Sequence, residues 1–508
     1  MWLPARSVQR RSPGHLLVIV MKNMAEWLLW LSVVMGLALL IDPDYLDSGD
    51  SKFILLIGAI GLWRYSIGGL HLLRGLWFMR VTFPAMRRCI ERDPQSYAPS
   101  HIYLVVTSFR IPADTTWNVY ASVFREAVNC GTPATVVVSI VERADENLIR
   151  QCHREFDQQG CVKLIICRAR GTGKRDGLAL AFRAVSRTMP DKDAVVGVVD
   201  GDTMLAPDCV RDSVCFFGLM PNLGGLTTNE QCVVRGSRLM RDWHTMRFAQ
   251  RHLNMCSMAL SRRVLTMTGR MSFFRAAVLT SPEFIADVES DYLVHWRLGK
   301  FRFLTGDDKS SWNALMTLGW DTFYVPDAHT LTVEHPPHHR FVPATLQLMF
   351  RWYGNSLRQN LRATQLGWRR LGVFATFVLY DQRISMWTCL IGLTVALMMA
   401  SLQHWQVFAV YVFWIALSRT LVAALLTLTC HPVGPLYPVL LYYNQIVGSL
   451  VKIFALFHLD RQSWTRQKTT LSVQNAGFDA VFNRISSKTM LFAAGSVFVC
   501  LMVLLTSS

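Results

Sequence analysis

The chain has 508 residues, enough for one sizeable soluble domain together with a membrane portion. Hydrophobic residues make up 51% of it and the formal net charge is +17, a combination that favours Lys/Arg-rich loops beside a membrane over nucleic-acid binding. The twelve cysteines include no Cys-x-x-Cys pair and no Cys/His spacing suited to zinc, so we interpret them as reduced core residues.

Two apolar segments near the N-terminus, residues 24–41 and 53–79, are long enough to span a membrane, although Arg64 and Arg74 interrupt the second. The loop between them is acidic, whereas arginines follow the second segment. Because basic residues collect on the cytoplasmic side, this bias places the N-terminus and the following domain in the cytoplasm. We therefore expect residues 1–81 to form an N-terminal region with two transmembrane helices.

Residues 82–343 alternate between strand and helix patterns and predict a cytoplasmic domain. The expected strands are 102–107, 135–141, 162–167 and 194–199, and the expected helices lie near 115–128, 145–159 and 177–186. This alternation is typical of an α/β domain with a mostly parallel sheet. Ligands of such sheets bind beyond the carboxyl ends of the strands, so polar residues that follow a strand are candidate ligand contacts.

Two acidic pairs follow apolar runs in this domain. Asp200 and Asp202 come directly after one predicted strand, and Asp307 and Asp308 precede Lys309 a hundred residues later. Carboxylates at positions i and i+2 can reach one divalent cation, and a separate carboxylate can act as a general base. The alternative for Asp-Gly-Asp alone is a tight surface turn.

A glycine-rich loop, residues 171–177, contains Lys174 and Arg175 and opens onto the predicted helix near 177–186. Backbone amides, two cations and a helix N-terminus together suit a diphosphate. The loop lacks the spacing of a P-loop, and a solvated basic turn is the alternative.

The C-terminal third predicts interfacial amphipathic helices at 344–385 and a transmembrane region at 386–508. Residues 386–402, 407–429 and 490–505 are expected to span. Residues 436–459 are apolar but contain Lys452 and precede a basic tract, so we expect them to lie at the interface or to re-enter. This arrangement gives five spans in total and an external C-terminus.

In order and approximate spacing, these motifs resemble those of the processive family 2 glycosyltransferases, namely the hyaluronan, chitin and cellulose synthases. The resemblance covers roughly residues 100–470 and implies an α/β glycosyltransferase-A domain inserted between transmembrane helices. The matching pieces are Gly173-Lys174-Arg175, Asp200-Gly201-Asp202-Thr203, Thr268-Gly269, Phe274-Arg275, Gly306-Asp307-Asp308-Lys309, Arg351-Trp352 and Ser463-Trp464-Thr465-Arg466.

The resemblance implies a role for each matching residue on the nucleotide-sugar side. Asp200 and Asp202 would hold Mg²⁺ or Mn²⁺ on the nucleotide diphosphate, and Lys174 and Arg175 would lie beside that diphosphate. Asp308 would be the catalytic general base, with Asp307 and Lys309 shaping its surroundings.

On the acceptor side, Arg351 and Trp352 match the end of a Gln-Gln-x-Arg-Trp motif, and Thr268 and Gly269 would also contact the acceptor. Trp464 and Arg466 match a cytoplasmic gating loop near 460–470 that covers the nucleotide. The sequence departs from the family pattern at two places. Leu348 and Met349 replace the two glutamines. The early aspartate of the family has no match, which leaves Glu142 and Asp145 as alternatives for contacting the base of the nucleotide.

At finer grain, residues 287–291, 305–311, 351–355 and 460–467 resemble the catalytic glycosyltransferases of bacterial alginate synthesis. This resemblance implies an enzyme of the bacterial inner membrane that polymerises GDP-mannuronate into polymannuronate and passes it across. It also implies a cyclic di-GMP-binding co-polymerase subunit and periplasmic export proteins as partners. The alternatives are synthesis of another β-linked polysaccharide and non-processive transfer to a lipid carrier; a transporter is disfavoured because the apolar segments flank an intact soluble domain.

An acidic polymer needs a path that is not acidic. Arginines of the amphipathic stretch could line such a path, with binding of lipid headgroups as the favoured alternative. They are Arg358, Arg362, Arg369, Arg370 and Arg383.

Overall fold

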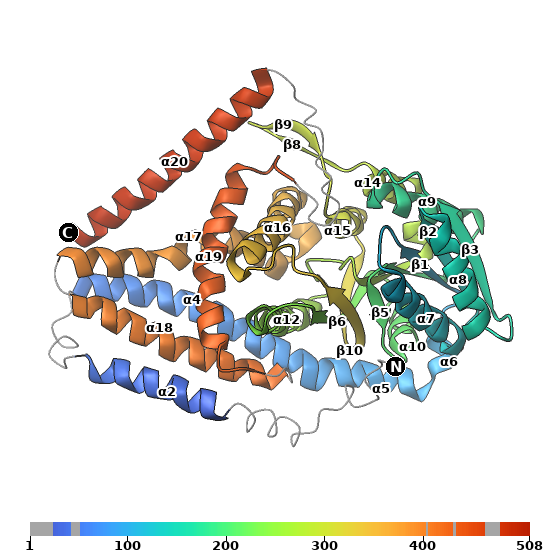
Figure 1. Ribbon diagram of the computed structural model, residues 1–508, viewed down its shortest axis with the longest axis horizontal. Coiled ribbons are helices and arrows are strands. Elements are labelled where there is room, and N and C mark those ends of the chain that lie inside the picture. The colour runs from blue at the N-terminus through green and yellow to red at the C-terminus, as the bar shows by residue number, and fades with distance from the viewer. Residues whose placement is uncertain (1–23, 42–50, 403–404, 430–432, 463–477, 508) are drawn as a thin grey trace.

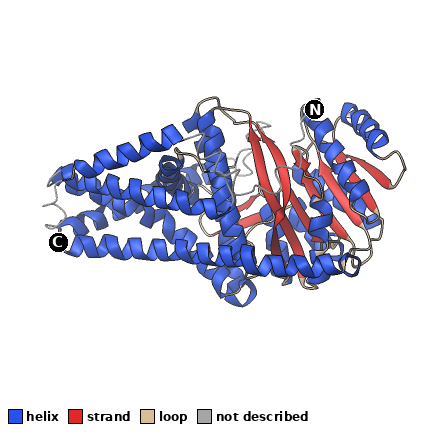
Figure 2. Cartoon of the chain, turned by 90° about the horizontal axis from the view of Figure 1, so that it is seen from below, coloured by secondary structure: helices blue, strands red, loops and turns tan. Residues whose placement is uncertain are grey.

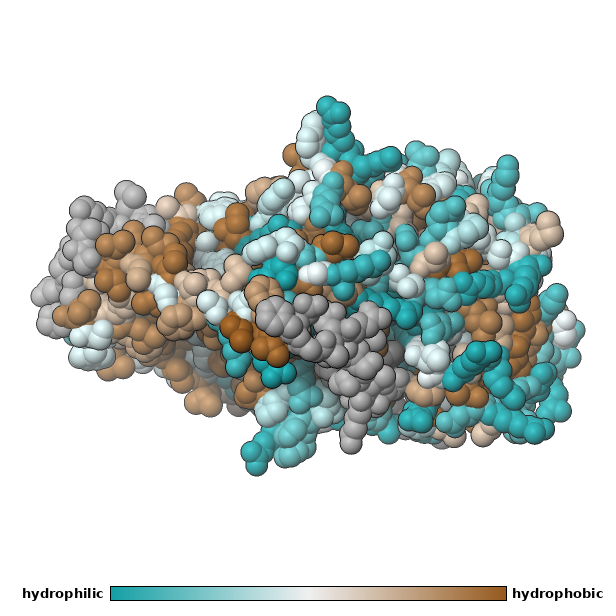
Figure 3. Space-filling model, turned by 90° about the horizontal axis from the view of Figure 1, so that it is seen from above, coloured by the Kyte–Doolittle hydropathy of each residue, from teal (hydrophilic) through white to brown (hydrophobic). Residues whose placement is uncertain are grey.

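The computed structural model describes residues 24–41, 51–402, 405–429, 433–462 and 478–507. An α/β domain lies at one end and long helices extend from it at the other (Figures 1 and 2). Figure 3 shows hydrophobic surface gathered over the helical end and hydrophilic surface over the α/β domain. The division between a polar domain and an apolar helical region therefore agrees with the sequence.

The α/β domain is built on an eight-stranded sheet in the order β3-β2-β1-β4-β7-β6-β10-β5. Its neighbours pair in parallel except at β4–β7, β7–β6 and β10–β5. The predicted mostly parallel sheet is thus confirmed. The strands are β1 (Ile102–Thr107), β2 (Ala134–Ile140), β3 (Val162–Arg168), β4 (Val195–Asp200), β5 (Thr203–Leu205), β6 (Leu223–Val234), β7 (Met271–Arg275) and β10 (Asp321–Glu334), with β8 (Tyr292–His295) and β9 (Gly299–Arg302) as a separate hairpin.

Each face of the sheet has its own hydrophobic core, because successive side chains of a strand point to opposite faces. Leu104 and Val106 of β1 belong to one core, whereas Tyr103 and Val105 belong to the other. Helices α7 (Ala113–Asn129), α8 (Arg143–Phe156) and α10 (Cys209–Val214) contribute to the first, and α9 (Lys174–Arg187), α14 (Pro282–Glu289) and α15 (Asp307–Leu318) to the second. The described cysteines are all free, as expected for a reduced domain.

The second core also contains residues of α16 (Phe341–Leu371) and α17 (Val373–Leu402), so the helical end is packed directly against the sheet domain. The chain breaks between these two helices at Gly372, whose φ of 81° favours glycine. The boundary that we expected between residues 385 and 386 instead falls inside α17, because apolar character begins with the packed part of the helix, before the membrane-length run.

Four helices in the described part of the chain are long and apolar enough to cross a membrane: Val373–Leu402, Trp405–Thr429, Tyr437–Phe457 and Ala480–Leu505. They contain the three C-terminal spans expected from the sequence. The third is α19 (Tyr437–Phe457), which we expected at the interface. Its length and composition also allow it to cross, yet Figure 1 shows it running steeply across α17 and α18 (Trp405–Leu426). The interfacial placement stays a prediction.

The N-terminal helices differ from the simple pair that the sequence predicts. Helix α2 (Met24–Leu39) has 16 residues, about 24 Å of length. Helix α4 (Ser51–Trp77) continues through a π-helical turn into α5 (Phe83–Arg92) and runs along α12 (Arg238–Ala259). A Cβ at Gly75 would lie 2.7 Å from Leu253 Cδ1, so α12 packs closely on α4. Part of α4 thus serves as a support for the sheet domain.

Candidate active site

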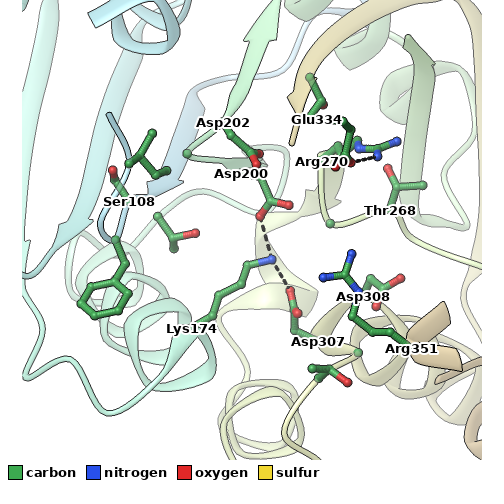
Figure 4. A pocket seen from close by; sticks show the side chains of 18 of the residues that line it. Ser108, Lys174, Asp200, Asp202, Thr268, Arg270, Asp307, Asp308, Glu334 and Arg351 are labelled. Atoms are coloured by element: carbon green, nitrogen blue, oxygen red, sulfur yellow. Dashed lines mark hydrogen bonds and ion pairs between the residues drawn. The ribbon is translucent and has the colours of Figure 1, made fainter. Parts of the chain in front are cut away.

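A cavity of about 920 Å³ lies beyond the carboxyl ends of the sheet strands, between the sheet domain and α16 (Figure 4). We call one side of it the sheet end, comprising Lys174, Asp200, Asp202 and Asp307. The other side is the helix end, comprising Arg247 of α12 and Arg351 and Trp352 of α16. The structure therefore brings together residues that lie up to 178 positions apart in the sequence.

The Asp-Gly-Asp sequence is placed by β4, whose final residue is Asp200. Thr107 of β1 is its partner in the parallel register, and the Asp200 amide donates to the Arg270 carbonyl oxygen at 3.0 Å. A Cβ on Gly201 would lie 2.5 Å from the Thr107 carbonyl oxygen, so only glycine lets the turn pass the end of β1. The turn lines a cavity and is not the surface turn of the alternative interpretation.

Lys174 joins the two acidic pairs. Its ammonium nitrogen lies 2.7 Å from Asp200 Oδ1 and 2.7 Å from Asp307 Oδ2 (Figure 4). Gly173 ends the loop with a φ of 154°, and α9 begins at Lys174, three residues before the expected helix start at residue 177. The ammonium therefore faces the cavity as a fixed cation at the sheet end.

The structure corrects the expectation for Arg175. This residue is 5% exposed, and its guanidinium donates to the carbonyl oxygens of Val288 and Thr305 at 2.7 and 3.2 Å. It does not line the cavity. The physical reason is the helix: Lys174 and Arg175 are neighbours in the first turn of α9 and point in different directions, so only one can reach the cavity.

Asp307 and Asp308 open helix α15, where the positive end of the helix dipole favours carboxylates. Gly306 precedes them with a φ of 86°. Burial acts to raise the pKa of Asp307, but the charges of Lys174 and Arg175 outweigh it and lower the pKa below its ordinary value. Asp307 is therefore held as an anion by its neighbours.

Asp308 behaves differently from its neighbour. Burial and the charge of Asp307 raise its pKa, against the opposing charge of Lys309. The Thr266 hydroxyl lies 3.5 Å from Asp308 Oδ2 and accepts from the Lys309 ammonium at 2.5 Å. Asp308 is thus a carboxylate whose affinity for a proton is increased while it lines the cavity, as a general base requires.

The sheet end has the chemistry of a divalent-metal site. Burial raises the pKa of Asp200 to about 6, with the charges of Asp202 and Asp307 adding to it and that of Lys174 opposing it. This unneutralised negative charge is what a hard cation with oxygen ligands offsets. Within the described ranges no group of three or more His, Cys, Asp or Glu side chains could hold a metal. Asp200 and Asp202 fit a cation that takes its remaining ligands from a diphosphate or water.

At the helix end, Arg351 and Trp352 both line the cavity. Figure 4 shows Arg351 extending from α16 toward Asp308. Trp352 stacks on Trp243 with ring centroids 5.9 Å apart and planes 16° apart. Thr268 and Gly269 line the cavity as well, and a Cβ on Gly269 would lie 3.3 Å from the Lys174 ammonium. These predicted residues therefore share one site.

The chain matches one family model and several known proteins. The family model described as "Glycosyltransferase like family 2" matches residues 99–355. Glycosyltransferase alg8 of Pseudomonas syringae pv. tomato is 57% identical over 480 residues, which are 94% of this chain and 97% of that protein. Glycosyltransferase alg8 of Azotobacter vinelandii is 55% identical with the same coverage.

The chain belongs to the family 2 glycosyltransferases. The predicted glycosyltransferase-A domain is confirmed, and the enzyme is similar over nearly its whole length to the two alg8 proteins. A solved structure, mannosyltransferase PcManGT from Pyrobaculum calidifontis in complex with GDP-Man and Mn²⁺, has a TM-score of 0.39 and 14% identity, and covers 75% of this chain and 98% of that one. That likeness is too distant to bear on substrate or metal.

Sequence reasoning missed a buried charge network in the wall of this glycosyltransferase cavity. Glu230 of β6 is 4% exposed and accepts from Arg251 at 2.7 Å and from Arg270 at 2.9 Å, and Arg270 also pairs with Glu334. All four residues line the cavity. The spacing of Arg247 and Arg251, four residues apart, was the one available signal that two arginines share a face of α12.

The structure places several other predicted residues away from the cavity. Neither Glu142 nor Asp145 lines the cavity, whereas Ser108 and Ser139 do, and the hydroxyl of each is buried without a hydrogen-bond partner. Of the five arginines considered for a polymer path, none lines the cavity, and three are bound to protein groups. Arg358 donates to the Leu459 carbonyl oxygen, Arg362 pairs with Asp291, and Arg383 donates to Asn360. Trp464 and Arg466 lie outside the described residues.

Proposed function

We propose that this glycosyltransferase polymerises GDP-mannuronate into polymannuronate at a processive, metal-dependent site. The supporting observation is the single cavity in which Lys174, Asp200 and Asp202 face Arg351 and Trp352, with Asp308 lining the same space. Close similarity to two alg8 glycosyltransferases supports the choice within the family. A donor site and an acceptor site that share one cavity are what transfer of a sugar to a growing chain requires.

The chain's own residues account for each requirement of an inverting transfer. Lys174, fixed between Asp200 and Asp307, lies where it can offset charge on the leaving diphosphate. Asp308 takes the proton of the acceptor hydroxyl as that oxygen attacks the anomeric carbon from the face opposite the leaving group. Mg²⁺ or Mn²⁺ held by Asp200 and Asp202 would supply further charge stabilisation for the departing nucleotide.

The setting of the reaction follows from the charges and the apolar helices. We place the sheet domain in the cytoplasm of a bacterium and the apolar helices in its inner membrane, because the basic residues lie beside the sheet domain. The gating segment near 460–470 and the partners, a cyclic di-GMP-binding co-polymerase and export proteins, are part of the same proposal.

The test is to incubate membranes that contain the protein with a panel of GDP- and UDP-sugars, and to measure nucleotide release and polymer size. Of the sugars in the panel, we expect only GDP-mannuronate to give nucleotide release. The product should be an acidic polymer that a mannuronate lyase degrades. Membranes with Asp308→Asn give the background. A polymer made from a UDP-sugar, or a single sugar on a lipid, would contradict the proposal.

A further inference from the structure

Arg247 is an unusual cation at the helix end of the cavity. Its Cζ lies 4.3 Å from the ring centroid of Trp352, 4.9 Å from that of Trp243 and 5.7 Å from that of Tyr353. Its Nη1 nitrogen is buried and has no hydrogen-bond partner. Three aromatic rings thus hold the guanidinium in place while leaving a donor unused.

The neighbouring cavity arginines show the contrast. Arg251 and Arg270 both pair with Glu230. In the described part of the chain no carboxylate forms an ion pair with Arg247, and burial lowers its pKa. Since a guanidinium stays charged in proteins, the half-buried Arg247 carries a positive charge without a paired carboxylate, which an anion would stabilise.

We propose that Arg247 binds the carboxylate of the acceptor sugar that contacts Trp352, so that this site selects an acidic acceptor. The inference rests on the proposed function, because it takes the growing chain to be a polyuronate. The guanidinium donates two parallel N–H groups, which match the two oxygens of a carboxylate. Trp352, which lines the same cavity, contacts the sugar ring beside this carboxylate.

A second cation, Lys452, lies beside the same aromatic cluster as Arg247. The ammonium nitrogen of Lys452, a residue of α19, lies 4.9 Å from the Tyr353 ring centroid. Arg247 and Lys452 therefore both contact the Tyr353 ring, one from α12 and the other from α19.

The experiment measures two acceptors on the same protein. The first is a short β-linked oligomannuronate, and the second is the same oligosaccharide with its carboxyl groups reduced to alcohols. For purified full-length protein we measure direct binding of each oligosaccharide, and KM and kcat with GDP-mannuronate as donor. We expect Arg247→Met to weaken oligomannuronate binding and raise its KM by about 10- to 100-fold. Binding of the reduced oligosaccharide should change little.

Three comparisons make the result decisive. Arg247→Lys should recover part of the preference for the acidic oligosaccharide, because it keeps the charge and loses the paired donors. Arg241→Met, an exposed arginine of the same helix outside the cavity, should leave both acceptors unchanged. Unchanged GDP binding shows that each variant is folded.

An equal loss for both oligosaccharides in Arg247→Met would overturn the inference and leave Arg247 as a support for Trp352. Wild-type protein that binds the reduced oligosaccharide as tightly as the acidic one would overturn it as well. The binding measurement uses no sugar donor. If GDP-mannuronate is not the donor, turnover will be absent while the preference for the acidic oligosaccharide remains. Failure of the proposed function is thereby distinguished from failure of this inference.

Discussion

The two ends of the cavity are built from different elements and carry opposite charge. The sheet end has three aspartates around Lys174, placed by the end of β4 and the first turns of α9 and α15. The helix end has arginines and aromatic rings on α12 and α16. The first suits a cation and a diphosphate, and the second suits an anionic sugar chain.

This difference indicates that donor and acceptor are recognised by separable parts of the protein. The sheet end lies on elements of the α/β domain, whereas α16 belongs to the helical region that packs on that domain. Substitutions at the sheet end should therefore affect the donor, and substitutions at the helix end should affect the acceptor. Variants that affect both equally would contradict this separation.

The largest effect is expected at the sheet end. Asp202→Ala removes one of two carboxylates available to a metal and should lower nucleotide release by about 10³-fold or more, with or without acceptor. Protein yield in membranes should stay normal because the side chain lines a cavity and is not part of either core. The matched control is Asp191→Ala, an exposed aspartate in the turn before β4. Near-normal release from Asp202→Ala would remove the metal assignment.

A smaller effect is expected at the helix end. Trp352→Ala removes the ring that we propose contacts the acceptor, and it should raise the acceptor KM by about tenfold while donor binding stays unchanged. Trp368→Ala, a 59% exposed tryptophan on the same helix, is the control for general effects on α16. The separation of the two ends would fail if Trp352→Ala weakened donor binding as much as acceptor binding.

Much of the fold could be predicted because it depends on local patterns. The β-branched runs around β1, β2 and β4, and the strand–loop–helix order at Gly173, identify the parallel half of the sheet. The expected end of the amphipathic region at residue 385 falls inside α17, which is apolar from its first residues, where it packs on the sheet domain. Hydropathy cannot separate a helix buried in protein from one in lipid.

The site was predictable where a motif is compact and not where it depends on packing. Asp200, Asp202, Asp307 and Asp308 lie in short motifs at element ends, and all four line the cavity. Arg175 was misassigned because the direction of its side chain depends on Val288 of α14 and on Thr305, which are both more than 100 residues away in the sequence. Arg247 and Glu230 belong to long elements that reach the cavity only through tertiary packing, so the local sequence shows no more than the spacing of Arg247 and Arg251 on α12.

The most direct test of the account is the substitution Asp308→Asn, which keeps the shape of the side chain and cannot accept a proton. We expect kcat to fall by about 10²–10⁴-fold while the affinity for GDP-mannuronate remains close to that of wild type. Because burial raises the pKa of Asp308, the wild-type rate should fall with decreasing pH through a pKa above the ordinary 3.8, and this acid limb should be absent in the variant. An Asp308→Asn enzyme that polymerises at nearly the wild-type rate, or that loses donor binding, would contradict the assignment of Asp308 as the base.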